Sequence, residues 1–213
     1  MKKILFDWNG TLLDDVEAGF SCMVKTQKKY GIKPLENVDQ YREIFGFPVK
    51  AYYEKAGFDF SRQDWSQVGQ AFMDDYVSCF QNIPLNPQAV SVLKKAREAG
   101  YVSLILSATR LDLLKDQVMH FDELKELIDG VYGIEDIYAS SKVSAGQEIL
   151  KSSLPWDQLV MIGDTLHDGQ VASALGIPAI LCATGHQSRK VLETSGLPVV
   201  DSLQEAFEKV KSL

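Results

Sequence analysis

Short apolar runs that alternate with amphipathic segments constrain the fold of this chain more than any other feature of its sequence. The apolar runs are Ile4 to Phe6, Val102 to Leu106, Leu159 to Ile162, Ala179 to Cys182 and the shorter Val199-Val200. Helical patterns occupy residues 87–99, 143–151, 168–175 and 202–212. Short apolar strands joined by such helices are typical of a parallel sheet that is covered on both faces. The sequence therefore predicts an α/β fold with a Rossmann-like parallel sheet.

Residues 15–82, the insert, do not show this alternation of apolar runs and helical patterns. They contain no convincing buried strand, and their helical patterns fall in 15–30, 37–45, 48–56 and 62–81. The segment 83–87 that follows, with two prolines, is typical of a linker. We therefore expect an α/β core domain of residues 1–14 and 83–213, with a helical domain of residues 15–82 inserted after the first strand.

The charge balance excludes one class of partner. The 213 residues carry a formal net charge of −7. Binding of nucleic acid requires a clustered basic face, so no nucleic-acid partner is expected. A small anionic substrate is compatible with this charge, because a local cation or a bound metal ion overrides the global balance.

The N-terminal stretch, the short apolar runs and the cysteines indicate a protein of a reducing, aqueous compartment. The N-terminal apolar stretch is shorter than the apolar region of a signal peptide, and no run approaches the ~18 apolar residues that span a bilayer. Cys22, Cys79 and Cys182 lie far apart in the sequence, which favours reduced thiols. We expect a cytoplasmic protein with no membrane partner, and the sequence leaves its oligomeric state open.

Polar residues end three of the apolar runs, and they are the candidates for chemistry. These residues are Asp7, Ser107 and Asp164, with Asp168 four positions beyond Asp164. In an open parallel sheet, ligands bind at the carboxyl ends of the strands. A carboxylate after three apolar residues is costly unless it is paired or bound to a metal ion. Oxygen ligands of this kind suit Mg²⁺, and a carboxylate beside Mg²⁺ can attack phosphorus.

Other residues near these strand ends are suited to binding a phosphoryl group. Ser107 can donate a hydrogen bond to a phosphoryl oxygen, with Thr109 as its rival for that role. Gly10 permits a close backbone approach just after Asp7, and Thr11 supplies a hydroxyl and an amide. Arg110 is a further candidate for the phosphate, although an exposed helix start explains it equally well.

Four segments in order resemble the motifs of the haloacid dehalogenase superfamily. The segment Phe6-Asp7-Trp8-Asn9-Gly10-Thr11-Leu12 resembles its DxDGT motif, Ser107 its second motif, Lys142 its third, and Gly163-Asp164-Thr165-Leu166-His167-Asp168 its GDxxxD motif. The resemblance covers nearly the whole chain, and the insert stands where that superfamily places a helical C1 cap domain. Phosphoglycolate phosphatases and hexose-phosphate mutases such as β-phosphoglucomutase have this layout.

The resemblance implies a mechanism and a role for each motif residue. Asp7 would be the nucleophile, and Mg²⁺ would be held by Asp7, the main-chain carbonyl of Asn9 and Asp164, with Asp168 acting through water or as an orienting group. Ser107 and Lys142 would hold the phosphate, helped by amides around Gly10 and Thr11. The predicted activity is that of a Mg²⁺-dependent phosphatase, a phosphoric monoester hydrolase, which forms an aspartyl-phosphate from a small phosphorylated metabolite.

Asn9 departs from the superfamily pattern. Phosphatases of the superfamily carry Asp at this position, as general acid and then base, whereas an amide cannot exchange a proton usefully near neutral pH. General acid–base help is worth roughly 10²–10⁴ in rate. His167, His186, Asp14 and Asp15 are possible substitutes, although the two aspartates are expected to cap the helix that follows them.

Two alternatives to the phosphatase are open, one invited by the Asp7-Trp8 opening of the first motif and one by the missing acid–base group. Phosphonoacetaldehyde hydrolases of the superfamily have DxAGT and form an imine through a cap lysine, for which Lys50 and Lys55 are candidates. A protein that binds phosphorylated ligands with little turnover is the second alternative, because the acid–base group is missing.

Overall fold

The computed structural model describes residues 2–134, 142–152 and 158–213. A six-stranded sheet has the order β3-β2-β1-β4-β5-β6, and every neighbouring pair is parallel. The strands are β1 (Lys2–Phe6), β2 (Tyr101–Arg110), β3 (Gly130–Ile134), β4 (Gln158–Gly163), β5 (Ala179–Cys182) and β6 (Val199–Val200). The predicted α/β class with a parallel sheet is therefore confirmed.

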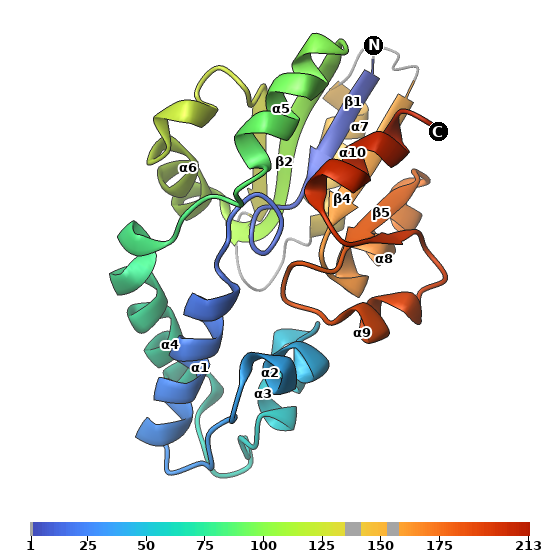
Figure 1. The fold of residues 1–213 in the computed structure, drawn as a ribbon. Helices are drawn as coiled ribbons and strands as arrows, with labels where there is room; N and C mark the ends of the chain where they lie inside the picture. The colour runs from blue at the N-terminus through green and yellow to red at the C-terminus, as the bar shows by residue number, and fades with distance from the viewer. Residues whose placement is uncertain (1, 135–141, 153–157) are drawn as a thin grey trace.

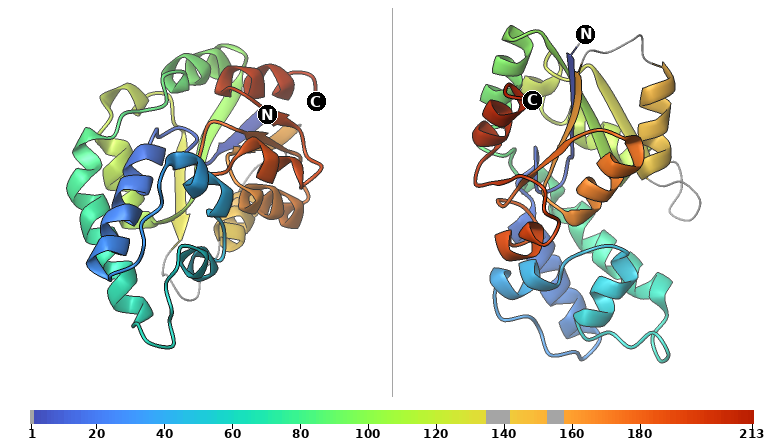
Figure 2. Two further views of the ribbon diagram at one scale, coloured as in Figure 1. Left: turned by 60° about the horizontal axis from the view of Figure 1, so that its bottom comes forward. Right: turned by 90° about the vertical axis from the view of Figure 1, so that its right-hand side faces the viewer.

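The central strand β1 is buried on both faces, which explains its unbroken apolar sequence. Ile4 and Phe6 belong to one apolar core, and Leu5 between them belongs to another. Successive side chains of a strand point to opposite faces, so each side of the sheet needs its own layer of helices. Helices α5 (Ala89–Glu98), α6 (Leu111–Met119) and α10 (Leu203–Val210) contribute to the first core, and α7 (Lys142–Ser152) and α8 (Leu166–Leu175) to the second. Figure 2 shows these two layers on either side of the sheet.

The insert forms a separate helical layer beyond the carboxyl end of the sheet (Figure 1). Its helices are α1 (Val16–Lys29), α2 (Val38–Ile44), α3 (Val49–Lys55) and α4 (Trp65–Cys79), followed by the 3-10 turn η1 (Phe80–Asn82). They enclose a third apolar core that is rich in aromatic residues, among them Tyr41, Tyr52, Tyr53 and Phe58. The helical character expected for residues 15–82 is confirmed.

The two chain segments that join the insert to the sheet run side by side. The amide of Asp14 donates to the carbonyl oxygen of Pro84 at 2.9 Å, and the amide of Asn86 donates to that of Leu12 at 2.8 Å. Leu13 and Leu85 also form an isolated antiparallel bridge. The insert therefore enters and leaves the core through one narrow, hydrogen-bonded neck.

The structure contains elements that the sequence pattern does not predict. The edge strand β3 has two glycines and is mostly half-buried, so it has no unbroken apolar run. Helix α9 (Arg189–Glu193) and the 3-10 turn η2 (Asp122–Leu124) are too short to show a period. Strand β2 also continues to Arg110, beyond its expected end at Leu106. Among the described residues, no helix is long and apolar enough to cross a membrane.

Candidate active site

Three buried aspartates gather at the carboxyl end of the sheet. Asp7 directly follows β1, Asp164 directly follows β4, and Asp168 lies in the first turn of α8. A carboxylate oxygen of each lies within 4.8 Å of the other two. Phe6 is in register with Ile162, so the residues that follow the two strands emerge at the same edge of the sheet. Parallel pairing thus brings together the two acids that the sequence places at strand ends.

Lys142, at the start of α7, is the cation of this cluster. Its Nζ lies 2.7 Å from Oδ1 of Asp7 and forms a second ion pair with Asp168. Burial alone would lower the pKa of Lys142, but Asp168 and Asp7 overcome it and raise the pKa to about 12. The lysine is therefore charged, and it holds the Asp7 carboxylate from one side.

Asp168 is oriented by the start of its own helix. Its Oδ2 accepts hydrogen bonds from the Thr165 hydroxyl at 2.7 Å and the Thr165 amide at 2.9 Å, and the bond from the amide is one half of a capping box. Although burial raises the pKa of a carboxyl, Lys142 and Thr165 hold the pKa of Asp168 below its usual value. Asp168 is therefore a charged residue that positions Lys142, in line with an orienting role.

Asp164 is held by backbone and hydroxyl groups. Its Oδ1 accepts from the hydroxyl of Thr11 at 3.1 Å, and its Oδ2 accepts from the amide of His186 at 2.6 Å. Two glycines allow the backbone to pack closely against the Asp164 carboxylate. A Cβ at Gly10 would lie 2.3 Å from Oδ2 of Asp164, and one at Gly185 would lie 2.1 Å from it. Gly10 also has φ +70°, a conformation that favours glycine.

The cluster has more negative charge than its lysine can balance. Burial, followed by the field of Asp168, raises the pKa of Asp7 to about 8 in the metal-free site. Burial also raises the pKa of Asp164 to about 6, against the opposing effect of His186. Carboxylates that resist ionisation in this way gain most from a divalent cation, and three convergent oxygen donors fit one.

The packing of Gly185 against Asp164 leads to a stability prediction. Gly185→Ala should lower the free energy of unfolding by about 1–3 kcal/mol, because the new methyl group must displace a buried carboxylate. Urea denaturation measures this. Gly69→Ala in α4 is the control, since no atom lies within 4 Å of its Cβ position, and it should be neutral or stabilising. Equal effects of the two substitutions would contradict the close contact.

Ser107 and Thr109 occupy the same side of the site. The Ser107 hydroxyl donates to Oγ1 of Thr109 at 3.1 Å and accepts from the Thr109 amide at 3.1 Å. The Thr109 hydroxyl in turn donates to Oδ1 of Asn9 at 2.9 Å. Ser107 is 1% exposed, so its hydroxyl lies inside the fold. The two hydroxyls that the sequence offers as rivals therefore form one hydrogen-bonded unit next to Asn9.

The amides expected to help bind phosphate have protein acceptors. The amide of Gly10 donates to Oδ1 of Asp15 at 2.7 Å. The amide of Thr11 donates to the carbonyl oxygen of Trp8 at 3.3 Å. In this structure the loop after β1 is thus held together by its own hydrogen bonds.

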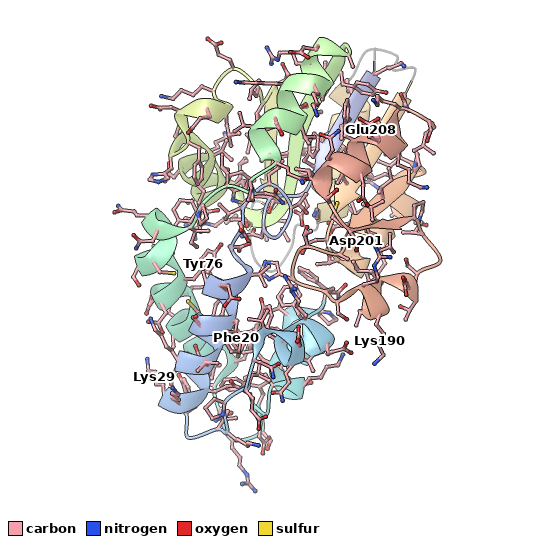
Figure 3. The ribbon with its side chains drawn as sticks, in the orientation of Figure 1. Phe20, Lys29, Tyr76, Lys190, Asp201 and Glu208 are labelled. Carbon is pink, nitrogen blue, oxygen red and sulfur yellow. The ribbon has the colours of Figure 1, made fainter. Side chains whose placement is uncertain are left out.

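Asn9 is fixed by three hydrogen bonds. Besides accepting from Thr109, its Nδ2 donates to Oδ2 of Asp15 at 2.8 Å and to the hydroxyl of Tyr76 at 2.9 Å. Tyr76 lies on α4, and Figure 3 shows it near the end of the insert that faces the sheet, with Lys29 at the far end. The side chain that departs from the family pattern is therefore a link between core and insert.

Asp15 does not cap α1 as expected. It occupies the N-cap position, but its carboxylate makes no capping bond and accepts instead from Gly10, Asn9, the Tyr76 hydroxyl at 2.6 Å and His186 at 3.1 Å. Burial would raise the pKa of Asp15, but His186 and the Tyr76 hydroxyl hold it below its usual value. Charge-assisted bonds to buried donors outweigh a single cap bond at a helix end.

His186 is the buried partner of Asp15. Its Nε2 faces Asp15, and its Nδ1 lies 2.7 Å from the hydroxyl of Tyr41 on α2. Burial lowers the pKa of a histidine, but Asp15 reverses this and raises the pKa of His186 to about 9. The ring also stacks on Phe45, with centroids 4.7 Å apart. His186 is therefore a charged contact between the core and the insert, and Tyr41 and Tyr76 are site residues that the sequence does not identify.

A second set of contacts seats the insert on the loop after β5. Gln187 donates to the carbonyl oxygen of Phe45 at 2.7 Å and accepts from the amide of Leu166 at 2.7 Å. The rings of Phe47 and His167 stack with centroids 4.4 Å apart. The loop around Phe47 thus rests on the start of α8, close to the acidic cluster.

Comparison with known proteins decides the family. The sequence model of the haloacid dehalogenase-like hydrolases matches residues 4–182. The chain belongs to this family. It is 25% identical over 205 residues to a phosphoglycolate phosphatase of Caulobacter vibrioides, covering 92% of this chain and 85% of that protein. It is 24% identical to a phosphoglycolate phosphatase of Aquifex aeolicus, covering 87% of this chain and 86% of that protein.

The fold agrees with a solved haloacid dehalogenase-like family hydrolase of Streptococcus pneumoniae. The TM-score is 0.81 at 22% identity, and the match covers 98% of each chain. Helices of the insert are included in this match, since it spans nearly the whole of both chains. The haloacid dehalogenase-like fold therefore includes the inserted helices as well as the sheet.

Three candidate residues from the sequence have contacts other than the acidic cluster. The Arg110 guanidinium makes two hydrogen bonds to Asp112, at 2.6 and 2.8 Å, and both side chains are exposed. The helix-start interpretation of Arg110 is thus the one that the structure supports. Lys50 lies over the ring of Phe60, and Lys55 lines a hollow of about 520 Å³ on the insert, together with Glu43.

Proposed function

We propose that this haloacid dehalogenase-like hydrolase is a Mg²⁺-dependent phosphatase that forms an aspartyl-phosphate on Asp7 from a small phosphorylated metabolite. The observation that carries this proposal is the buried Asp7 carboxylate, held 2.7 Å from Lys142 in a cluster whose excess negative charge fits a divalent cation. The relatives named phosphoglycolate phosphatase support a substrate of this size and charge.

The residues of the site divide the chemistry between them. Asp7 and Asp164, with the carbonyl oxygen of Asn9, would hold Mg²⁺, which would supply positive charge for the phosphoryl oxygens. A carboxylate oxygen of Asp7 attacks phosphorus while the bond to the leaving oxygen breaks. Lys142 stabilises the charge on the transferring group, and the Ser107 hydroxyl donates to one of its oxygens.

The insert, residues 15–82, acts in this proposal as a cap domain over the core of residues 1–14 and 83–213. The neck at Asp14 and Pro84 joins the two, and the contacts of His186 and Gln187 seat the cap beside the site. Seating of the cap excludes water while the phosphoryl group is transferred. It also limits the substrate to a small molecule.

Removal of the metal ion tests the cofactor. Phosphate release from small phosphoesters should fall by about 100-fold or more after chelation with EDTA and return with Mg²⁺, because a catalytic cation supplies several kcal/mol of charge stabilisation. The melting temperature should rise with Mg²⁺ alone, because the cation relieves the repulsion between Asp7 and Asp164. Full activity without a divalent cation would refute the proposed cofactor.

The same assay separates the two alternatives. A binding protein with little turnover would shift its melting temperature with phosphorylated ligands without releasing phosphate. A phosphonatase that forms an imine would be inactivated by borohydride in the presence of phosphonoacetaldehyde. The contacts of Lys50 with the Phe60 ring and of Lys55 with a hollow on the insert favour the phosphatase over the phosphonatase.

A further inference from the structure

The structure offers no free proton donor for a leaving group among the described residues around Asn9. A general acid must come within about 2.6–3.2 Å of the atom it protonates, directly or through one water. Asn9 carries an amide, which donates hydrogen bonds but does not transfer protons near neutral pH. Its three hydrogen bonds to Thr109, Asp15 and Tyr76 also hold it in one orientation.

Asp15 and His186, the acid–base side chains in the network around Asn9, are hydrogen-bonded to each other. Each carboxylate oxygen of Asp15 faces two donors: Gly10 and His186 on Oδ1, and Asn9 and Tyr76 on Oδ2. Both ring nitrogens of His186 have partners, Asp15 and Tyr41. Within the part of the chain that the structure describes, this closed network leaves neither residue with an open position for a substrate oxygen.

The remaining candidates for the acid–base role, His167 and Asp14, make no hydrogen bond to Asn9 among the described residues. The ring of His167 is stacked on Phe47. Asp14 is exposed and lines a hollow of about 280 Å³ with Asn86 and Asp201. Of the four substitutes that the sequence offers for the missing aspartate, Asp15 and His186 are therefore bonded within the network, and His167 and Asp14 lie outside it.

We propose that this enzyme acts on phosphates whose leaving group departs as a stable anion, such as acyl, enol and aryl phosphates, and that its aspartyl-phosphate outlives the departure of that group. The inference rests on the proposed function and names the substrate class of the same site. It sets this chain apart from an enzyme whose substrate is an alkyl phosphate.

The first step explains the selection. An oxygen of Asp7 forms a bond to phosphorus, the bond from phosphorus to the leaving oxygen breaks, and that oxygen departs with the electron pair. A carboxylate, enolate or phenolate is stable as such and takes a proton later from solvent. An alkoxide is strongly basic and needs the proton during bond cleavage, which a general acid would supply at a gain of roughly 10²–10⁴ in rate.

The second step explains the long-lived intermediate. A water oxygen attacks phosphorus, the bond to the Asp7 oxygen breaks, the carboxylate is regenerated and inorganic phosphate leaves. The attacking water loses its proton to solvent, because Asn9 cannot accept it and Asp15 and His186, the acid–base side chains described around Asn9, are bonded to each other. This step should therefore be slowed by a similar factor of roughly 10²–10⁴, whichever substrate supplied the phosphoryl group.

A pair of substrates matched in size tests the inference. Acetyl phosphate and ethyl phosphate differ in their leaving group, a carboxylate or an alkoxide, and hardly in shape. Phosphate release is measured with Mg²⁺ for the wild-type chain and for Asn9→Asp. The ratio of kcat/KM for acetyl over ethyl phosphate should be about 100-fold or more higher in the wild type than in Asn9→Asp. Asn82→Asp on the exposed turn η1 is the matched control, and its ratio should equal that of the wild type.

A measurement on the wild type alone covers the case in which Asn9→Asp does not fold. Rapid mixing with 4-nitrophenyl phosphate should give a burst of nitrophenolate close to one per active site, followed by slow turnover, and acid-quenched protein should carry one phosphoryl group. No burst, or equal ratios in wild type and Asn9→Asp with phosphate still released, would overturn the inference and leave the phosphatase standing. No phosphate and no phosphoenzyme from any compound would overturn the proposed function itself.

Discussion

Asp7→Asn should lower phosphate release by on the order of 10⁴-fold or more, because it removes the atom that attacks phosphorus. The substituted side chain has nearly the same shape, so the loss reports chemistry and not packing. An amide also offers a weaker ligand to Mg²⁺ and no charge to Lys142, whose Nζ lies 2.7 Å from Asp7. Initial rates with acetyl phosphate and Mg²⁺ give the measurement, and acid-quenched protein should carry no phosphoryl group.

The control for this substitution is Asp74→Asn on the exposed face of α4, where the carboxylate accepts a hydrogen bond from Gln70. It should keep the wild-type rate and the wild-type phosphoenzyme. Residual activity of Asp7→Asn above a few per cent, with the protein shown to be folded, would mean that another group attacks phosphorus. The phosphoenzyme proposal would then be wrong.

Sheet geometry explains why the sequence predicts the acidic part of the site. Asp7 and Asp164 each follow an apolar run that is buried on both faces, and parallel strands in register end at one edge. The sequence indicates where each run ends, so it also indicates which side chains meet. Only the resemblance to a family motif predicts Lys142 as a site residue, because a lysine before a helix has no distinctive local pattern.

The network around Asn9 could not be predicted in the same way. Asp15 and His186 are separated by 171 positions, and their contact depends on how the insert is seated on the sheet. Helical periodicity shows which face of α2 or α4 is apolar, but not which tyrosine reaches the core. The position of Asp15 before a helix favoured a capping role, and tertiary contacts with buried donors overrode it.

The edge strand β3 was missed for a related reason. It has a sheet neighbour on one side only, so most of its residues are half-buried, and it contains Gly130 and the buried Gly133. A Cβ at Gly133 would lie 2.5 Å from the carbonyl oxygen of Thr109. Gly133 interrupts the apolar pattern by which β3 would be recognised in the sequence. The close approach of its backbone to the end of β2 requires a glycine there.

Loss of the buried Asp15–His186 ion pair should strongly reduce the stability of the fold. Asp15→Ala should lower the free energy of unfolding by about 3–5 kcal/mol, because it leaves a charged histidine buried without its partner. Three further donors, on Gly10, Asn9 and Tyr76, lose their acceptor as well. For a chain of this size the melting temperature should fall by about 6–20 °C. Asp112→Ala removes an exposed ion pair and should leave the melting temperature nearly unchanged.

The pH dependence of stability distinguishes the ion pair from a simple packing loss. The pKa of His186 is raised from 6.5 to about 9, so its contribution is fully present below pH 6.5 and is lost as the pH rises through 9. The pKa of Asp15 is lowered, so its contribution is present above the usual carboxyl value and is lost as the pH falls. Urea denaturation of the metal-free protein between pH 6 and 9.5 should show stability declining with pH in the wild type, and less so in Asp15→Asn, whose amide cannot hold the histidine charged. Parallel pH profiles of the two proteins would mean that the pair is not ionic, and core and insert would then be joined by packing and neutral hydrogen bonds alone.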